Sequence, residues 1–483
     1  MKLPLGLQLV FLLLLLSSSA FAQDEVWSLQ RCLEYARAHN IQIQQQALQK
    51  ERSNISWKQS RLSQLPQISG SADYGKNFGR SIDPTTNQFV SNELSSAGID
   101  INAGVTLFNF FQIRNTIKSN ALQYQAGDAI LKKMVNDISL NVANAYLQIL
   151  LSKEQVKISQ QQISLTLNQL DNTLKQVKAG VLPESNVADI QAQLARDSAT
   201  LVNNKNQVED AILQMKVLLN LDFRTTFIPE KPDLETIPLL NLGELSPEQI
   251  FASAINHQPV IVADSLLVSS AEMMLAATKA RLYPSLSLGA RLGTNYSSSY
   301  QRPIGEYLVD VPPSPIGKVT VGGNDYVVNS LPQQVSTPKY EDPSLGNQLN
   351  DNLRESVALS LSIPIFSGWQ TRAQVENAKL DLQSQKLTQE DDLLSLKQDV
   401  YTAYYQAQAA YKNYLAATRT LKATEKSFSY AQKRYEVGLI NSLEYLTSQN
   451  DLFNAQADLI SKHYDYIFKM KVLEFYKNLR ISL

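Results

Sequence analysis

A strict seven-residue period is the feature that most constrains the fold of this 483-residue chain. Apolar or aromatic residues recur at every seventh position through two separate stretches. The first stretch comprises Val135, Val142, Ile149, Val156, Ile163, Leu170 and Val177, and the second Leu393, Val400, Ala407, Tyr414, Leu421, Phe428 and Tyr435. A period of seven sustained over many turns is typical of long helices that supercoil around neighbours. The sequence therefore predicts two helices of about 70 residues, each on the order of 100 Å long.

The two predicted helices belong to two copies of one unit. The segment LFNFFQIRNTI at 107–117 matches IFSGWQTRAQV at 365–375, at an offset of about 258 residues. The same offset places Gly180 on Gly438. Upstream of these segments the offset is about 218 residues, so the second copy carries an insertion of about 40 residues. We interpret the chain as an internal tandem repeat.

Each copy is expected to contain a helix, a strand, a loop, a second strand, a long helix, a tight turn and a final helix. We expect a signal peptide at 1–22, the first repeat at 23–221, a linker at 222–244 and the second repeat at 245–483. The first repeat divides into a helix at about 28–62, a β-hairpin at 67–108, a long helix at 109–178, a tip turn at 179–183 and a helix at 184–220. The second divides into a helix at 246–282, a β-hairpin at 285–366 with a long loop at 297–353, a long helix at 368–436, a tip turn at 437–441 and a helix at 442–478.

The N-terminal residues read as an export signal. Lys2 supplies a positive charge, Leu9–Leu16 an apolar run, and Ala20–Ala22 a small-x-small cleavage site. The run is short for a bilayer, and we expect no other run long enough for a transmembrane helix. The only cysteine, Cys32, lies past the cleavage site, so it cannot carry a lipid as the first mature residue, and no disulfide can form within the chain. We interpret it as a small buried helix residue.

The predicted strands have one apolar and one polar face. The apolar positions are Ile99, Ile101, Ala103, Val105 and Leu107 in one strand, Leu286, Leu288, Ala290 and Leu292 in the next, and Val357, Leu359, Leu361, Ile363 and Ile365 in the last. This alternation is typical of outer-membrane barrels, although a soluble antiparallel sheet with one wet face gives the same pattern. Four strands are too few to close alone, so several chains must share one barrel. Because such barrels carry their long loops outside the cell, the loop at 297–353 is expected there and the helices in the periplasm.

With these parts in this order, the sequence resembles the TolC family of outer-membrane efflux proteins over essentially the whole mature chain. The resemblance depends on the duplication, the joints TLFNFF and IPIFSG, and the turns AGVLPES and VGLINSL, each followed by a glutamine, Gln191 or Gln449. It implies a mainly α fold with a membrane β-barrel part: a homotrimer whose twelve-stranded barrel, four strands per chain, continues as a periplasmic α-helical barrel. It also implies a passive exit duct in the outer membrane, in contact with lipid and served by a periplasmic adaptor and an inner-membrane pump of the RND or ABC type.

The resemblance places the tip turns at the periplasmic end, where family members contact the adaptor. The matching residues are Gly180, Val181 and Leu182 in the first repeat and Gly438, Leu439 and Ile440 in the second.

The resemblance also implies a gate at the same end, containing Tyr435 and Glu444, with Asn186 or Asp189 as the polar partner of the tyrosine. Thr447 and Ile440 stand where the family has an acidic and a basic residue, so we expect a looser or differently bonded gate. Plain packing of Tyr435 and a helix-dipole role for Glu444 are the alternatives. Three Glu444 side chains around a symmetry axis would make the entrance acidic and cation-preferring.

The two strand-to-helix joints share an apolar–Phe pair, an aromatic residue, a glutamine and an arginine. The expected joint residues are Phe108, Phe111 and Arg114 in the first repeat and Phe366, Gly368, Trp369 and Arg372 in the second. Gly368 permits a bend, but the first repeat has Phe110 at that position. We therefore expect the shared residues, and not the glycine, to make the joint.

Nothing in the sequence indicates an enzyme. No CxxC, HExxH, GxSxG or P-loop pattern occurs, and His39 and His257 occupy equivalent repeat positions, which favours a structural role. We expect no catalytic, cofactor or metal site. With 44 Lys and Arg against 45 Asp and Glu, no nucleic-acid partner is expected either. Two other functions stay open: the exit duct of a type I protein secretion system, and a fibrous, adhesin-like coiled coil in the periplasm.

Overall fold

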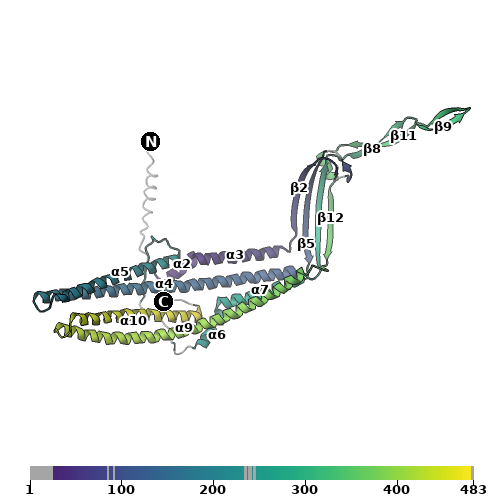
Figure 1. Ribbon diagram of the computed structural model, residues 1–483. Helices are drawn as coiled ribbons and strands as arrows, with labels where there is room; N and C mark the ends of the chain where they lie inside the picture. The colour runs from purple at the N-terminus through teal and green to yellow at the C-terminus, as the bar shows by residue number, and fades with distance from the viewer. Residues whose placement is uncertain are drawn as a thin grey trace, which may run out of the picture. The chain divides into compact units, whose positions relative to one another are not determined.

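The computed structural model describes residues 26–83, 86–90, 93–232, 237, 242 and 246–479. The predicted signal peptide and part of the predicted linker lie outside these residues. The chain divides into two compact units (Figure 1). The first unit consists of the chain up to Trp57, Lys118–Met273 and Ala378–Leu483, and the second of Lys58–Ile117 and Met274–Asn377.

Helices account for most of the described chain, which confirms the mainly helical fold. The helices longer than ten residues are α2 (Leu29–His39), α3 (Ile41–Leu62), α4 (Gln112–Lys178), α5 (Ser185–Leu219), α6 (Pro247–His257), α7 (Pro259–Ala280), α9 (Gln370–Glu436) and α10 (Ser442–Asn478). The two longest, α4 and α9, have 67 residues each. Within the first unit, α5 returns along α4 and α10 returns along α9 (Figure 1).

The helices expected at 28–62 and 246–282 are each broken once, at equivalent positions. Asn40 ends α2 and Gln258 ends α6, both in extended backbone, and each residue donates its N–H to the carbonyl four residues earlier. The Asn40 side chain then accepts from the backbone N–H of Ile43 and so caps α3. Just before each break, Nδ1 of His39 or His257 lies 3.0 Å from the carbonyl oxygen four residues earlier.

The largest apolar core of the first unit forms where α2, α4 and α5 meet. Its fully buried members include Val142, Ile149 and Met215. Cys32 is also buried there, and burial raises the pKa of its thiol to about 12. The Tyr146 hydroxyl lies 2.7 Å and 2.9 Å from the carbonyl oxygens of Glu230 and Trp27. These carbonyls belong to or adjoin the parallel pair β1 (Val26–Trp27) and β6 (Ile228–Pro229), which the hydroxyl therefore ties to α4.

The second unit contains a four-stranded antiparallel sheet in the order β12-β7-β5-β2 (Figure 1). Its strands are β2 (Gln67–Asn77), β5 (Leu94–Phe108), β7 (Ser285–Ser297) and β12 (Arg354–Ser362). The register aligns one apolar residue from each strand in a row: Ile68, Ala103, Ala290 and Val357. The adjacent row is polar: Ser69, Asn102, Arg291 and Ser356. Because side chains alternate along a strand, the sheet has one apolar and one polar face.

The polar face of the sheet contains an ion pair between neighbouring strands. Arg291 Nε donates to Asp100 Oδ1 at 2.8 Å. A side chain at Gly293 would place its Cβ 2.4 Å from the same oxygen, so this position has room only for glycine while the carboxylate stays in place.

The segment 297–353, expected as a loop, contains regular structure. It forms two successive antiparallel pairs, β8 (Arg302–Val311) with β11 (Gln333–Glu341) and β9 (Pro315–Val321) with β10 (Asn324–Asn329). A short helix, α8 (Leu345–Asp351), follows, and β3 (Ser81–Ile82) pairs with β4 (Phe89–Val90) in the shorter connection. Most of the prolines in this segment lie at or beside strand ends, where no ladder N–H is needed.

One expectation about membrane helices requires correction. The helix α7 (Pro259–Ala280) is long and apolar enough to cross a membrane by length and composition, whereas the sequence was expected to contain no such run. Asp264 and Glu272 interrupt the apolar run of this helix. Core helices of soluble proteins pass the same test.

Candidate functional site

The two tip turns, one in each repeat, have the same backbone geometry. Gly180 and Gly438 adopt φ values of 74° and 75°. The residue after each glycine donates its N–H to the carbonyl five residues earlier: Val181 to Gln176 at 2.9 Å, and Leu439 to Arg434 at 2.8 Å. This bond and the left-handed residue define a Schellman C-cap, for which glycine is preferred. Nothing lies within 4 Å of a Cβ added at either glycine, so backbone conformation alone requires glycine there.

The predicted adaptor-contact residues differ in exposure. Val181 and Leu439 are each 70% exposed, and Leu182 is half-buried. Ile440 is buried and packs against the side chains behind the turn. The tips of both helical hairpins therefore present apolar side chains to their surroundings, although Ile440 is not one of them.

Tyr435 lies in a small aromatic cluster behind the second tip turn. Its ring stacks on Tyr445 with centroids 4.8 Å apart, and Ile190 of α5 is buried in the same cluster. Burial, with smaller contributions from Tyr435 and Glu436, raises the pKa of Tyr445 to about 12. Tyr435 thus packs within this cluster. Its hydroxyl is buried and has no hydrogen-bond partner among the residues that the structure describes.

The expected polar partners of the gate make other contacts. Asp189 accepts a hydrogen bond from the Ser442 hydroxyl at 2.8 Å, which links α5 of the first repeat to α10 of the second. Arg434 lies 3.6 Å from Glu444, and both side chains are more than half exposed. The Glu444 backbone N–H is capped by the Asn441 side chain at 2.8 Å. Asn186 is half-buried beside the first turn.

A buried polar layer, which the sequence did not indicate, lies further along the same helices. It consists of Thr166, Gln193, Asp197, Gln449 and Asn450. The Asp197 carboxylate accepts from the Thr166 hydroxyl at 2.7 Å and from the Gln193 amide at 2.8 Å. Gln193 also donates to Asn450 at 3.0 Å, and Gln449 donates to Thr166 at 3.4 Å. The layer therefore connects α4 and α5 of the first repeat to α10 of the second.

The two strand-to-helix joints of the second unit also share one backbone geometry. At each joint two consecutive residues have positive φ: Phe110 and Phe111 at 49° and 63°, and Gly368 and Trp369 at 55° and 68°. The side chain of the residue before each pair contacts the first turn of the following helix. The Asn109 side chain accepts a hydrogen bond from the N–H of Ile113 at 3.4 Å. The Ser367 hydroxyl accepts one from the N–H of Thr371 at the same distance.

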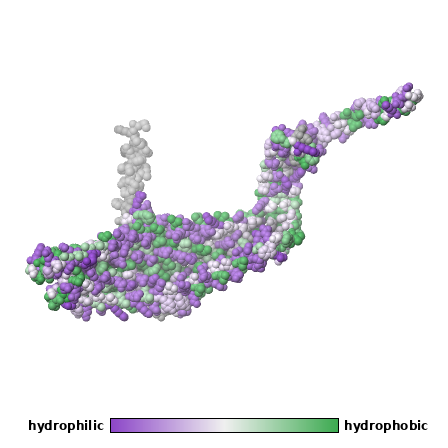
Figure 2. Space-filling model, viewed as in Figure 1, coloured by the Kyte–Doolittle hydropathy of each residue, from purple (hydrophilic) through white to green (hydrophobic). Residues whose placement is uncertain are grey.

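The side chains at the two joints differ more than the backbones. In the first joint Phe108 and Phe111 meet edge to face at 5.8 Å, and the Arg114 guanidinium lies 5.9 Å from the Phe111 ring centroid. In the second joint Phe366 is 90% exposed. A cavity of about 740 Å³ opens there, with Trp369 and Arg372 among its lining residues. Figure 2 shows hydrophobic residues gathered at this end of the sheet.

Among the described residues, no group of three or more His, Cys, Asp or Glu side chains could hold a metal ion.

The comparisons with known proteins agree with this geometry. A family model described as outer membrane efflux protein matches residues 32–221 and 251–469. No curated protein matches the chain by sequence. Similar solved structures include CusC, at 15% identity and a TM-score of 0.74 over 95% of each chain. The CmeC outer membrane channel of Campylobacter jejuni is similar at 14% identity and a TM-score of 0.73, over 93% of this chain and 85% of that chain. The outer membrane protein VceC of Vibrio cholerae is similar at 14% identity and a TM-score of 0.72, over 93% and 96%. At such identities the likeness shows a shared fold.

Proposed function

This chain belongs to the outer membrane efflux protein family, and we propose that it forms an outer-membrane channel, the passive exit duct of a tripartite efflux system for small molecules. The observation that carries the proposal is the four-stranded sheet of the second unit. Its register gathers apolar side chains on one face and polar side chains on the other, as a barrel wall between lipid and water requires.

The edges of this sheet support a trimer. β2 and β12 are its outermost strands and pair on one side only within the described chain. Unpaired backbone groups cannot remain in lipid, so the edges must pair with other copies. Two copies would give a barrel of eight strands, and side chains fill the interior of a barrel of that size. Three copies give twelve strands and leave a lumen. Three is therefore the smallest number of copies that leaves a duct for solutes.

The tip turns supply a surface for the proposed adaptor. Exposed apolar side chains such as Val181 and Leu439 are unusual at hairpin ends surrounded by water, unless a partner covers them. We assign them to contact with a periplasmic adaptor that joins the duct to an inner-membrane pump of the RND or ABC type.

The proposal is tested by reconstitution. The purified chain should have the mass of a trimer in detergent, and should form discrete conducting steps when added to a planar lipid bilayer. A monomer, or a trimer that binds to bilayers without conducting, would refute it. Adaptor contact is tested by co-purification with the adaptor of the same cell, which the uncharged paired substitution Val181→Ser and Leu439→Ser should abolish without changing conductance.

The gate proposal concerns Glu444. Three copies around the axis would attract cations, and the exposed Arg434 at 3.6 Å offsets only part of that charge because water screens the pair. Glu444→Gln should reduce the cation preference of the open channel, measured as a reversal potential in a salt gradient, and Arg434→Gln should increase it. Glu425→Gln, an exposed position on α9, is the matched control. Equal reversal potentials for all three variants would exclude Glu444 from the entrance.

A further inference from the structure

The segment between Arg302 and Glu341 forms a narrow extension beyond the sheet of the second unit (Figure 1). It consists of the pair β8–β11 followed by the pair β9–β10, and is termed the ribbon below. Nearly all of its side chains are exposed, including Tyr307, Val321 and Tyr326. Two-stranded ribbons are marginally stable in water on their own, so an extension of this length is expected to pack against something.

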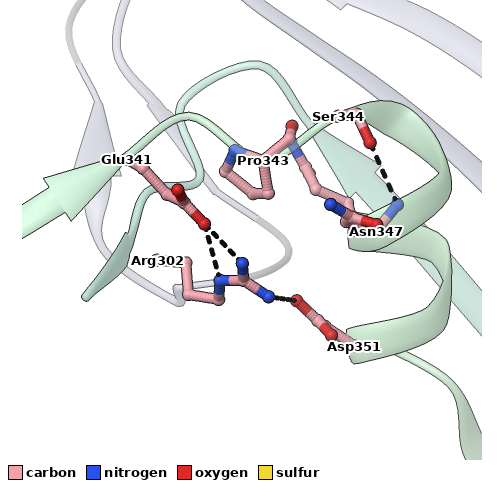
Figure 3. Close-up of polar contacts among 7 residues, drawn as sticks. Arg302, Glu341, Pro343, Ser344, Asn347 and Asp351 are labelled. Atoms are coloured by element: carbon pink, nitrogen blue, oxygen red, sulfur yellow. Dashed lines mark hydrogen bonds and ion pairs between the residues drawn. The ribbon is translucent and has the colours of Figure 1, made fainter. Parts of the chain in front are cut away.

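The base of the ribbon is fixed to the sheet by polar contacts (Figure 3). Arg302 Nε donates to Glu341 at 3.1 Å across the first strand pair, and Nη1 of Arg302 lies 3.4 Å from the Asp351 carboxylate of α8. Ser344 caps α8 by accepting from the Asn347 N–H at 3.4 Å. The ribbon therefore has a fixed point of departure, which limits where its outer part can reach.

Both parts of the ribbon have one mainly apolar face and one face that carries most of the charged residues. Cross-strand partners on the apolar face include Val309 with Val335 and Val319 with Tyr326. The large apolar residues of this face, termed the apolar face below, are Tyr307, Val309, Val311, Val319, Val321, Tyr326, Val328 and Val335.

Polar side chains on the opposite face bond across the strands. Gln334 donates to Asp310 at 2.9 Å, and Thr320 donates to Asp325 at 2.7 Å. Ser336 donates to Glu306 on the same face. Ile304, Leu308, Ile316 and Val327 lie on this face as well. The two faces therefore differ in charge, because Glu306, Asp310, Lys318 and Asp325 all lie on the same one.

We propose that the apolar faces of the ribbons of three copies of this chain pack against one another outside the membrane. This inference rests on the proposed trimer. From Tyr307 to Val335 the apolar face carries no charged residue, so its complement is another uncharged apolar face, and an identical copy supplies one. The trimer would hold the bases of the three ribbons at one level around its axis. Each apolar face would then meet the apolar faces of the other two copies at an effective concentration in the millimolar range, without any other partner.

Site-directed crosslinking tests the packing. The one native cysteine, Cys32, is fully buried, so an introduced thiol is the reactive one. Val309→Cys places a thiol on the apolar face, and Asp310→Cys places one on the polar face one residue away. With the purified full chain in detergent, a short bismaleimide should join two chains of the Val309→Cys trimer and leave Asp310→Cys monomeric on a denaturing gel. Val335→Cys and Gln334→Cys on β11 form a second pair, in case a variant of the first pair does not fold.

The mass of each variant in detergent separates this inference from the proposed function. A trimer in which the apolar-face cysteines crosslink no better than the polar-face cysteines would overturn the ribbon packing alone, and would indicate that the face meets lipid or another protein. An assembly other than a trimer would overturn the proposed function, and the ribbon packing with it.

Discussion

Replacement of Thr166 by valine should loosen the helices near the tip by a predictable amount. The Thr166 side chain is fully buried and donates to the Asp197 carboxylate, itself only 7% exposed, at 2.7 Å. Valine keeps the shape of threonine but removes the donor. A hydrogen bond to a charged group contributes about 1.5–3 kcal/mol, so the variant should lose about 2 kcal/mol of local stability. Asp197 would keep its bond from Gln193, which prevents a larger loss.

Hydrogen exchange of the backbone amides of α5 around Asp197 measures this loss. A change of 2 kcal/mol corresponds to opening that is about 30-fold more frequent. Thr173→Val is the matched control, because Thr173 is also fully buried in α4 but makes one neutral, 3.4 Å contact with Gln169. The control should change exchange by less than about threefold. In a double-mutant cycle with Asp197→Asn, Thr166→Val should show a coupling of at least about 1 kcal/mol. Equal effects of the two valine variants, or additive effects in the cycle, would refute a specific contribution from the polar layer.

Three further predictions follow from single positions. Gly438→Ala should destabilise the second tip turn by about 1–2 kcal/mol through its left-handed backbone, visible as faster exchange of the turn amides, while Gly438→Asn should cost less. Burial and the Asp392 carboxyl raise the pKa of Asp264 to about 6. Between about pH 4 and pH 6 this carboxyl keeps its proton in the folded state and loses it in the unfolded state. The free energy of unfolding therefore falls as the pH rises through this range. Asp264→Asn should accordingly raise the melting temperature at pH 8 and not at pH 4. Gly293→Ala should displace the Asp100 carboxylate, 2.4 Å from the new Cβ, and lower the yield of heat-resistant trimer on gels.

The seven-residue period predicted the long helices well, because such a period is required along the whole length of a supercoiled helix. Most of its positions are nevertheless only partly covered in the single chain. Val142 and Ile149 are fully buried, whereas Ile163 and Leu170 are half-exposed. A seven-residue period indicates which side chains are buried in the functional assembly. The single chain buries only some of them. This supports additional copies around α4.

The breaks at Asn40 and Gln258 were missed because hydrophobic periodicity continues through them. Local signals were present, since Pro259 suits the first turn of a helix and Asn40 suits a cap. The polar layer could not be predicted in the same way. Thr166, Gln193 and Gln449 are each ordinary polar residues of a helix, and only the packing of three helices shows that they are neighbours.

The two joints show why residue identity was a poor guide to the bend between strand and helix. A left-handed residue other than glycine costs about 1–2 kcal/mol. The first joint has two such residues, Phe110 and Phe111, whereas the second has only Trp369, because Gly368 stands in place of a phenylalanine. The backbone of the first joint is therefore less favourable by one such cost. The Phe110 ring stacks on Tyr283 with centroids 4.7 Å apart, and an aromatic pair of this kind contributes about 0.5–1.5 kcal/mol. The stacking offsets much of the backbone cost, and glycine has no ring with which to form it. Glycine with little packing and phenylalanine with an aromatic partner are therefore nearly equivalent ways to make the same bend.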